Sequence, residues 1–149
     1  MPRLLASWFG TGLILGGLRG SHNGSGTVAG ALTLPLALAI GVRWGWALQF
    51  AAAVGVTLVG MWAVRQLVEE EGDAGWIVVD EAAGTILSVV GLGLGTAVVG
   101  FLVFRVADIF KAPGVRAADE MPGFAGVMLD DLVAGLYGLA AGHLLQALL

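Results

Sequence analysis

Long apolar runs separated by short polar stretches make up most of this chain. The runs at 27–42, 44–68 and 126–149 are each predicted to form a helix. The run at 44–68 is long enough to cross the hydrocarbon core of a bilayer, which is ~30 Å thick. The first run, 4–18, gives a helix of only about 22 Å at ~1.5 Å per residue, so it either spans with help from its flanks or lies partly embedded. We interpret this run as part of the mature protein, because no clear signal-peptide cleavage site follows it.

The apolar run at 76–104 has two interpretations. As one helix, it would place Asp80 and Glu81 on the opposite membrane face from Asp108. The sequence Gly-Leu-Gly-Leu-Gly at 91–95 weakens a continuous helix, because glycine has a low helix propensity. Two helices of about 15 residues, joined at these glycines, would instead bring all three acidic residues to one side. We predict this hairpin.

The composition is that of an integral membrane protein. Hydrophobic residues make up 58% of the 149 positions and charged residues only 12%, against roughly 25% charged in an average soluble domain. We therefore expect an all-α, polytopic membrane helical bundle that forms a single domain over residues 1–149. The chain has no cysteine, which excludes disulfides, thiolate metal sites and a cysteine nucleophile. No basic tract indicates a nucleic-acid partner, and the sequence does not define an oligomeric state.

The charges fall in one part of the chain. All eleven acidic residues lie between Glu69 and Asp131. With the hairpin, the segments 19–27, 65–81 and 105–131 share one membrane side, which also carries five of the seven basic residues. The positive-inside rule then predicts that this side faces the cytoplasm.

A cluster of charged residues on that side indicates chemistry, because charges near lipid are costly to maintain without a function. Arg105, Asp108 and Lys111 recur at three-residue steps and so share one helix face. Oxygen ligands without cysteine or paired histidine suit Mg²⁺ or Mn²⁺, and neighbouring cations suit a phosphate group. The pattern thus fits metal-assisted phosphoryl chemistry at a membrane surface. The carboxylates on this side are Asp80, Glu81, Asp108, Asp130 and Asp131.

Structural interpretations exist for each of these groups. Asp80 could favour a helix N-terminus, Arg105 and Asp108 could form a structural ion pair, and the acidic pair at 130–131 could cap the last helix. The Gly/Ser-rich loop at 19–27 could present backbone N–H groups to an anion, or could be only a turn with a helix cap. A membrane cation transporter and a structural membrane subunit are the alternative functions. A transporter predicts acidic residues near the bilayer centre on several helices, whereas these acidic residues lie at helix ends on one side.

Three sequence blocks carry a resemblance to a known family. The block GSGTVAG at 24–30 resembles a PGTxGS loop, and WIVVDEAAG at 76–84 resembles an IVxDExxG block. The third and most specific block begins with Phe104-Arg105 and continues through MLDDLVAG at 128–135, which resembles FRxxDxxKPxPI…MxDDxxAG. Together they resemble the phosphatidylglycerophosphatase A family. Ser25 stands where that family has proline, and Ala-Pro-Gly at 112–114 replaces its Pro-x-Pro.

The resemblance implies a Mg²⁺-dependent hydrolase of phospholipid biosynthesis, which converts phosphatidylglycerophosphate to phosphatidylglycerol and phosphate. It implies a site that faces the cytoplasm in a bacterial inner membrane. The attacking group is either a water activated by the metal or an aspartate that forms a phosphoryl intermediate. The polar stretch 119–122 is expected to be solvated and apart from the site. The expected metal ligands are Asp80, Glu81, Asp108, Asp130 and Asp131; the catalytic residues are Asp80, Glu81, Asp108 and Asp131; and the substrate-binding residues are Ser25, Gly26, Thr27, Arg105, Lys111 and Arg116.

Overall fold

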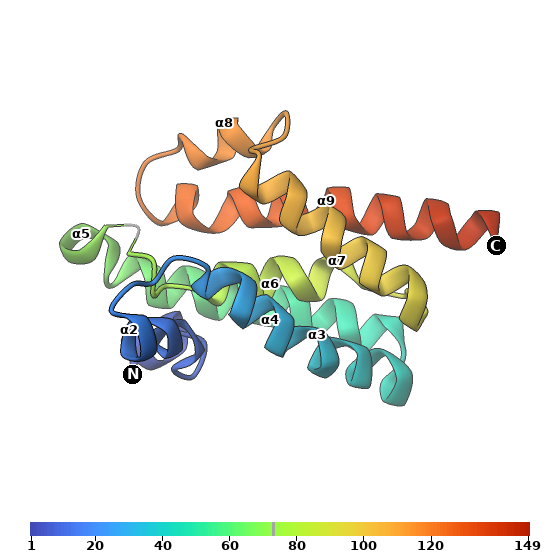
Figure 1. Ribbon diagram of the computed structural model, residues 1–149, viewed down its shortest axis with the longest axis horizontal. Coiled ribbons are helices and arrows are strands. Elements are labelled where there is room, and N and C mark those ends of the chain that lie inside the picture. Colours follow the sequence, from blue (N-terminus) through green and yellow to red (C-terminus); the bar gives the residue numbers. More distant parts are fainter. Residues whose placement is uncertain (73) are drawn as a thin grey trace.

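The protein is a bundle of helices that run roughly side by side (Figure 1). The computed structural model describes residues 1–72 and 74–149, and within these ranges it contains helices and no strand. The elements in chain order are α1 (Pro2–Ala6), the 3₁₀ helix η1 (Thr11–Leu13), α2 (Ile14–Arg19), α3 (Ser25–Trp44), α4 (Trp46–Arg65), α5 (Val68–Glu71), α6 (Val79–Ser88), α7 (Leu94–Ile109), α8 (Val115–Asp119) and α9 (Phe124–Leu148).

Among the described residues, three helices are long and apolar enough to cross a membrane, namely α3, α4 and α9. Their outer faces carry large exposed apolar side chains, such as Leu36, Leu58 and Leu136. An apolar exterior of this kind is unfavourable in water and suits contact with lipid. The predicted membrane helical bundle is therefore confirmed.

The N-terminal run does not form a span. It breaks after α1, where Trp8 and Phe9 adopt φ of 47° and 57° and Gly10 follows at 90°. Three successive residues in the left-handed region end a right-handed helix. The Val78 N–H donates to the carbonyl of Ala6 at 2.9 Å, which ties this segment to the chain just before α6. Of the two expectations for the run at 4–18, the partly embedded segment fits this geometry.

Helices α6 and α7 form the predicted hairpin, with the turn at 89–93. Side chains from two other helices form hydrogen bonds with backbone groups of this turn. These bonds stabilise the turn, since unpaired polar groups in an apolar setting are costly. From α4, Gln49 donates to the carbonyl of Val89 at 3.3 Å and accepts from the N–H of Gly91 at 2.9 Å. From α9, Gln146 accepts from the N–H of Gly93 at 2.8 Å.

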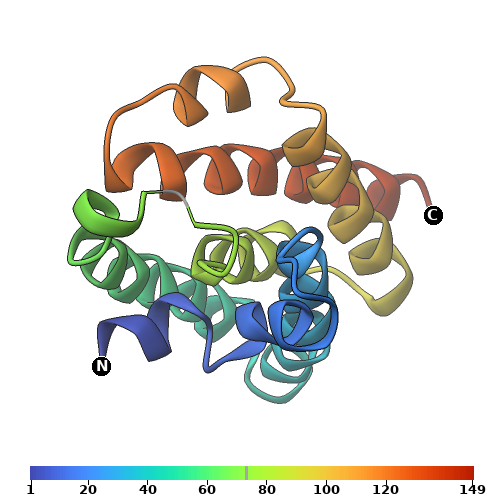
Figure 2. The same cartoon turned by 60° about the vertical axis from the view of Figure 1, so that its left-hand side comes forward.

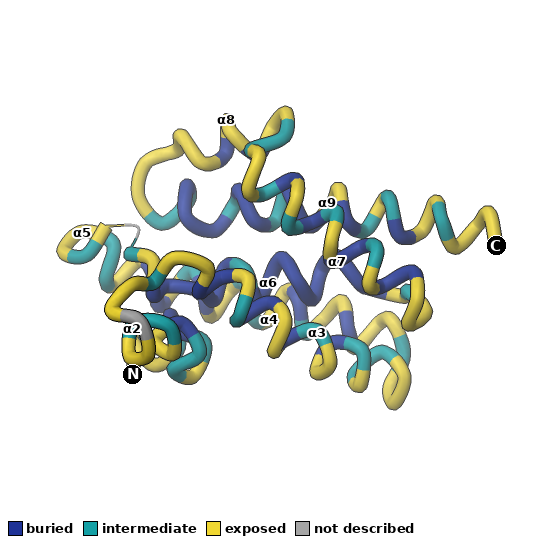
Figure 3. Tube along the Cα trace, in the orientation of Figure 1, coloured by how far each residue is buried: buried dark blue, intermediate teal, exposed yellow. Residues whose placement is uncertain are grey.

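Close helix packing holds the hairpin against α9. A Cβ on Gly135 would lie 2.9 Å from the carbonyl oxygen of Gly84, and a Cβ on Gly138 would collide with the carbonyl oxygen of Gly100. Glycines therefore allow the backbones of α6, α7 and α9 to approach closely, as small residues do in membrane bundles. Figure 2 shows α6 (yellow-green) enclosed by α3, α4, α7 and α9. Nearly all of α6 is buried (Figure 3), so its first turn is rigidly placed.

Candidate active site

The three sequence blocks meet in one cavity of about 420 Å³, at the end of the bundle where α3 and α6 begin and α7 ends. The hairpin brings the start of α6 beside the end of α7, as predicted. Residues of α9 and of the loop before α3 complete the walls. Ten predicted site residues line the cavity: Ser25, Gly26, Thr27, Asp80, Glu81, Arg105, Asp108, Lys111, Asp130 and Asp131.

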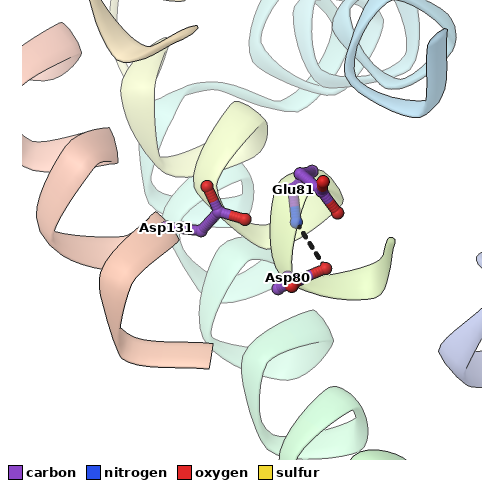
Figure 4. A group of neighbouring side chains, drawn as sticks. All are labelled: Asp80, Glu81 and Asp131. Atoms are coloured by element: carbon purple, nitrogen blue, oxygen red, sulfur yellow. Dashed lines mark hydrogen bonds between the residues drawn. The ribbon is translucent and has the colours of Figure 1, made fainter. Parts of the chain in front are cut away.

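Three carboxylates form the centre of the cavity. Asp80 and Glu81 lie on the first turn of α6, and Asp131 points toward them from α9 (Figure 4). One oxygen from each can be chosen so that all three lie within 4.8 Å of one another. Asp80 Oδ1 accepts a hydrogen bond from the Glu81 N–H at 3.0 Å, so that one of its oxygens has a protein partner.

These carboxylates have the features of a cation site. Glu81 Oε2 and Asp131 Oδ1 are buried and have no hydrogen-bond partner among the residues that the structure describes. Neighbouring carboxylates repel one another, and a hard divalent cation would satisfy acceptors that lack a partner. The cluster could therefore bind a metal ion.

Burial changes the pKa of Asp80 and Glu81, the two acidic residues of α6. This helix is not one of the three candidate spans. Burial, together with the charge of Glu81, raises the pKa of Asp80 well above its usual range. Burial also raises the pKa of Glu81, although the hydrogen bond with Asp80 and the charge of Arg105 act in the opposite direction. Without a cation, Asp80 and Glu81 thus favour protonation, and a bound cation would favour their ionised forms.

Lys111 links two further carboxylates of the cavity. Its Nζ lies 2.7 Å from Asp130 Oδ2 and 3.4 Å from Asp108 Oδ1. Partial burial lowers the pKa of Lys111, but the hydrogen bonds to Asp130 and Asp119 outweigh it and raise the pKa above its usual value. Lys111 adopts a left-handed backbone conformation, with φ of 50°, two residues after the end of α7. Such a conformation is unfavourable for lysine and is typical of functional sites.

Asp119 differs from the expectation that its stretch lies apart from the site. Its side chain is 42% exposed, yet its Oδ1 lies 3.0 Å from Lys111 Nζ. The chain reverses between α7 and α9, and α8 lies along the first turns of α9 (Figure 1). Asp119 is exposed, as expected for a solvated stretch, but it is also an ion-pair partner of a cavity residue, which the sequence did not predict.

Arg105 spans the gap between α7 and α3. Its Nη1 lies 3.1 Å from Asp108 Oδ2 in an ion pair, and its Nη2 donates to Thr27 Oγ1 at 3.5 Å. The Nη1 contact does not have hydrogen-bond geometry, so Nη1 and Nε are buried donors without a hydrogen bond among the described residues. These donors are available to an anion in the cavity.

The loop before α3 forms the opposite wall. Gly24 has φ of 86°, a left-handed conformation that glycine adopts readily, and α3 begins at the next residue. A Cβ on Gly26 would collide with Glu81 Oε1, so only glycine permits this close approach to the acidic cluster. The first amides of a helix lack intrahelical acceptors and carry partial positive charge, which favours an anion at this wall.

Some residues of the site differ from the sequence-based list. Arg116 is exposed on α8 and lies outside the cavity lining within the described part of the chain, so its substrate contact stays a prediction. Sequence reasoning did not select Asn23 or Ile109, and it gave His22 no role, although all three line the cavity. Asn23 and His22 lie in the Gly/Ser-rich loop, which was the available signal for them. The apolar Ile109 gave no signal.

Comparisons with known proteins identify the family of this chain. A family model described as phosphatidylglycerophosphatase A matches residues 4–146. The chain is also 32% identical over 151 aligned positions to a protein of Bacteroides thetaiotaomicron named "Putative phosphatidylinositol-3-phosphatase", with 92% of this chain and 88% of that protein covered. A search of solved structures gave no significant match. Because the family model covers nearly the whole chain and all three blocks of the cavity, the chain belongs to the phosphatidylglycerophosphatase A family.

Proposed function

We propose that this protein is a Mg²⁺-dependent phosphatase that hydrolyses phosphatidylglycerophosphate to phosphatidylglycerol and phosphate. The family and the Bacteroides relative support a membrane lipid phosphatase. The observation that carries the proposal is one cavity that combines a cluster of three carboxylates, two cationic side chains and a helix N-terminus. This combination suits a metal ion together with a phosphate group.

The name of the relative supplies a second candidate substrate, phosphatidylinositol 3-phosphate. Both lipids carry a phosphate monoester at the far end of the headgroup and a phosphodiester that joins the headgroup to diacylglycerol. The proposed reaction at the monoester is the same for both. They differ in the alcohol between the two phosphates, which is glycerol in one and inositol in the other.

The proposed cation would be held by Asp80, Glu81 and Asp131, whose oxygens already lie close together. When bound, Mg²⁺ would offset the negative charge of the carboxylates and polarise a phosphate oxygen. Asp108 and Asp130 would hold the Lys111 ammonium and could also contribute ligands from the edge of the cluster.

The cationic residues would hold the substrate phosphate. Arg105 has buried donors free for phosphate oxygens, and the amides of Gly26 and Thr27 would bind from the other wall. The raised pKa of Lys111 keeps its ammonium charged, so it would stabilise negative charge rather than act as a base.

We favour water as the attacking group. Its oxygen bonds to phosphorus while the ester bond to the headgroup oxygen breaks, so inorganic phosphate and the free alcohol result. The unpartnered oxygens of Glu81 and Asp131 are candidates to accept the proton of the water. That proton balances the one that the leaving alkoxide takes up. Attack by an aspartate is the alternative, with hydrolysis of the aspartyl phosphate as a second step.

We place the cavity at the cytoplasmic face of a bacterial inner membrane. The support is its position at the helix ends, where Arg105 and Lys111 line it and Arg3 pairs with Glu71, whereas Arg43 lies at the other end of α3. The same position argues against the cation-transporter alternative, for which acidic residues near the middle of the spans are expected.

The test is phosphate release by the purified protein from the two candidate lipids, with Mg²⁺ and with EDTA. We expect release from phosphatidylglycerophosphate in Mg²⁺ and its loss in EDTA. Faster release from phosphatidylinositol 3-phosphate would assign the substrate of the relative instead. Release that is equal in Mg²⁺ and EDTA would contradict the metal proposal, and no release from either lipid would contradict the phosphatase proposal.

A further inference from the structure

A second cavity adjoins the acidic one. It has a volume of about 520 Å³ and lies between the N-terminal segment and the chain that leads into α6. His22 lines both cavities, so its side chain forms their common wall. The second cavity contains no carboxylate among its described lining residues; Arg3 and Trp76 are the charged and aromatic groups in it.

A third cavity, of about 610 Å³, lies deeper along the bundle. Trp8 and Phe9 of the same N-terminal segment line it, together with Leu36 of α3 and other apolar side chains. Leu36 is eleven residues beyond the start of α3 at Ser25, which is about 16 Å at ~1.5 Å per residue. Because α3 is a candidate span, this apolar cavity lies at the depth of lipid chains.

The three cavities correspond to three parts of a phospholipid with a phosphorylated headgroup, namely its monoester phosphate, its phosphodiester and an acyl chain. The acidic cavity suits the monoester phosphate only with a cation present, and its carboxylates would repel a second phosphate. Lys111 already pairs with three carboxylates, and Arg105 pairs with Asp108. Neither is therefore well placed to bind the phosphodiester as well.

Arg3 is the cation suited to that second phosphate. Its side chain is 72% exposed, and its Nη2 lies 3.2 Å from Glu71 Oε2. Its guanidinium also lies over the ring of Trp76, 5.2 Å from the centroid, which holds it at the second cavity. A guanidinium has five N–H donors, so it can bind phosphate oxygens while it keeps this neighbour.

We propose that the cavity of Arg3, His22 and Trp76 binds the phosphodiester of the lipid substrate, and that the apolar cavity beneath Trp8 and Phe9 takes one acyl chain. The proposal rests on the lipid phosphatase function proposed above. It makes Arg3 a residue that selects lipids with two phosphates over lipids with one. Phosphatidate, whose single phosphate is a monoester attached directly to diacylglycerol, offers no phosphodiester to Arg3.

The test compares Arg3→Gln, Arg3→Lys and the wild type on phosphatidylglycerophosphate and phosphatidate in the same detergent. For Arg3→Gln we expect KM for the two-phosphate lipid to rise about tenfold relative to phosphatidate, the scale of one lost hydrogen bond to a charged group. Arg3→Lys should recover part of this loss because it retains the charge. Arg43→Gln, at the far end of α3, is the matched control and should change neither substrate.

A structural role of Arg3 through its pair with Glu71 predicts a different pattern. Glu71→Gln removes the same ion pair but leaves Arg3 free, so the proposal predicts an unchanged or lower KM for the two-phosphate lipid. An equal rise in KM for Arg3→Gln and Glu71→Gln would overturn the proposal. Equal effects of Arg3→Gln on both lipids would also overturn it.

A binding measurement keeps this test independent of turnover. Short-chain phosphatidylglycerol retains the phosphodiester and lacks the monoester, and it should raise the Tm of the wild type and of Glu71→Gln. The rise should be much smaller for Arg3→Gln. An equal rise in Tm in all three proteins would overturn the proposal, whether or not the protein hydrolyses either lipid. A lack of hydrolysis of both lipids would by itself contradict only the phosphatase function.

Discussion

Lys111 Nζ lies 2.7 Å from Asp130 Oδ2, a contact that joins the end of α7 to α9 across nineteen residues of sequence. The same ammonium lies 3.0 Å from Asp119 and 3.4 Å from Asp108, so one cation contacts three carboxylates from three parts of the chain. It is therefore the main positive charge at this edge of the cavity.

Replacing Lys111 by methionine should reduce both activity and stability. Methionine keeps most of the side-chain length but leaves the three carboxylates without their shared cation. We expect kcat/KM to fall by about 10², because a charge that stabilises the reacting phosphate is lost, and we expect Tm to fall. Lys111→Arg, which retains the charge, should lose less of both. Unchanged phosphate release by Lys111→Met would mean that this cation does not act on the substrate.

Gly26 tests the contact between the loop wall and the acidic cluster. In Gly26→Ala the new methyl group would collide with Glu81 Oε1 and displace that carboxylate. We expect kcat to fall at least about tenfold, since small displacements of positioned groups are costly in catalysis. Gly55→Ala on α4 is the matched control, because a Cβ there meets no atom within 4 Å. Similar activities of the two alanine variants would show that the position of Glu81 is not critical.

Mg²⁺ should stabilise the folded protein as well as activate it. A cation would satisfy the oxygens of Glu81 and Asp131 that have no partner among the described residues, so we expect the ion to bind the folded state in preference to the unfolded chain. At one hundred times its Kd, such a ligand adds ~2.7 kcal/mol to the free energy of unfolding. Tm measured in Mg²⁺ should exceed Tm in EDTA. Asp131→Asn should lose most of this difference, and a full difference in that variant would exclude Asp131 as a ligand.

The absence of native cysteine allows a direct test of topology. Single cysteines at Ser21 and Ala117, which are exposed near the cavity end, should react with a membrane-impermeant thiol reagent from the cytoplasmic side. A cysteine at Gly95, exposed just after the hairpin turn, should not react from that side. Labelling of Gly95 and Ala117 from the same face would contradict the membrane placement of the hairpin.

Sequence reasoning predicted the hairpin and most of the cavity because their signals are local. The glycines at 91–95 mark the break, and the acidic residues lie in blocks whose order resembles a known family. Once the hairpin is inferred, Glu81 and Asp108 must approach each other, and both line the cavity.

The remaining features depend on contacts that no local pattern encodes. Trp8 and Phe9 adopt positive φ although neither is a residue that favours it, so these two residues gave no signal of the break in the N-terminal run. The contact between Asp119 and Lys111 arises from the path of the chain between α7 and α9. The polar neighbours of Asp119 predicted its exposure, which the structure shows, but they did not predict its contact with Lys111.

The most direct test of the central claim compares two glutamates that differ in location. Glu81 lies in the acidic cluster, whereas Glu120 is exposed just after α8. Each is changed to glutamine, which keeps the shape and removes the charge, and kcat for phosphate release from phosphatidylglycerophosphate is measured at saturating Mg²⁺. The account predicts that kcat falls by about 10² or more in Glu81→Gln. Glu120→Gln should stay within a few-fold of the wild type, since surface substitutions shift stability by no more than about 0.5 kcal/mol. Equal kcat values for the two variants would contradict the assignment of the acidic cluster as the catalytic centre.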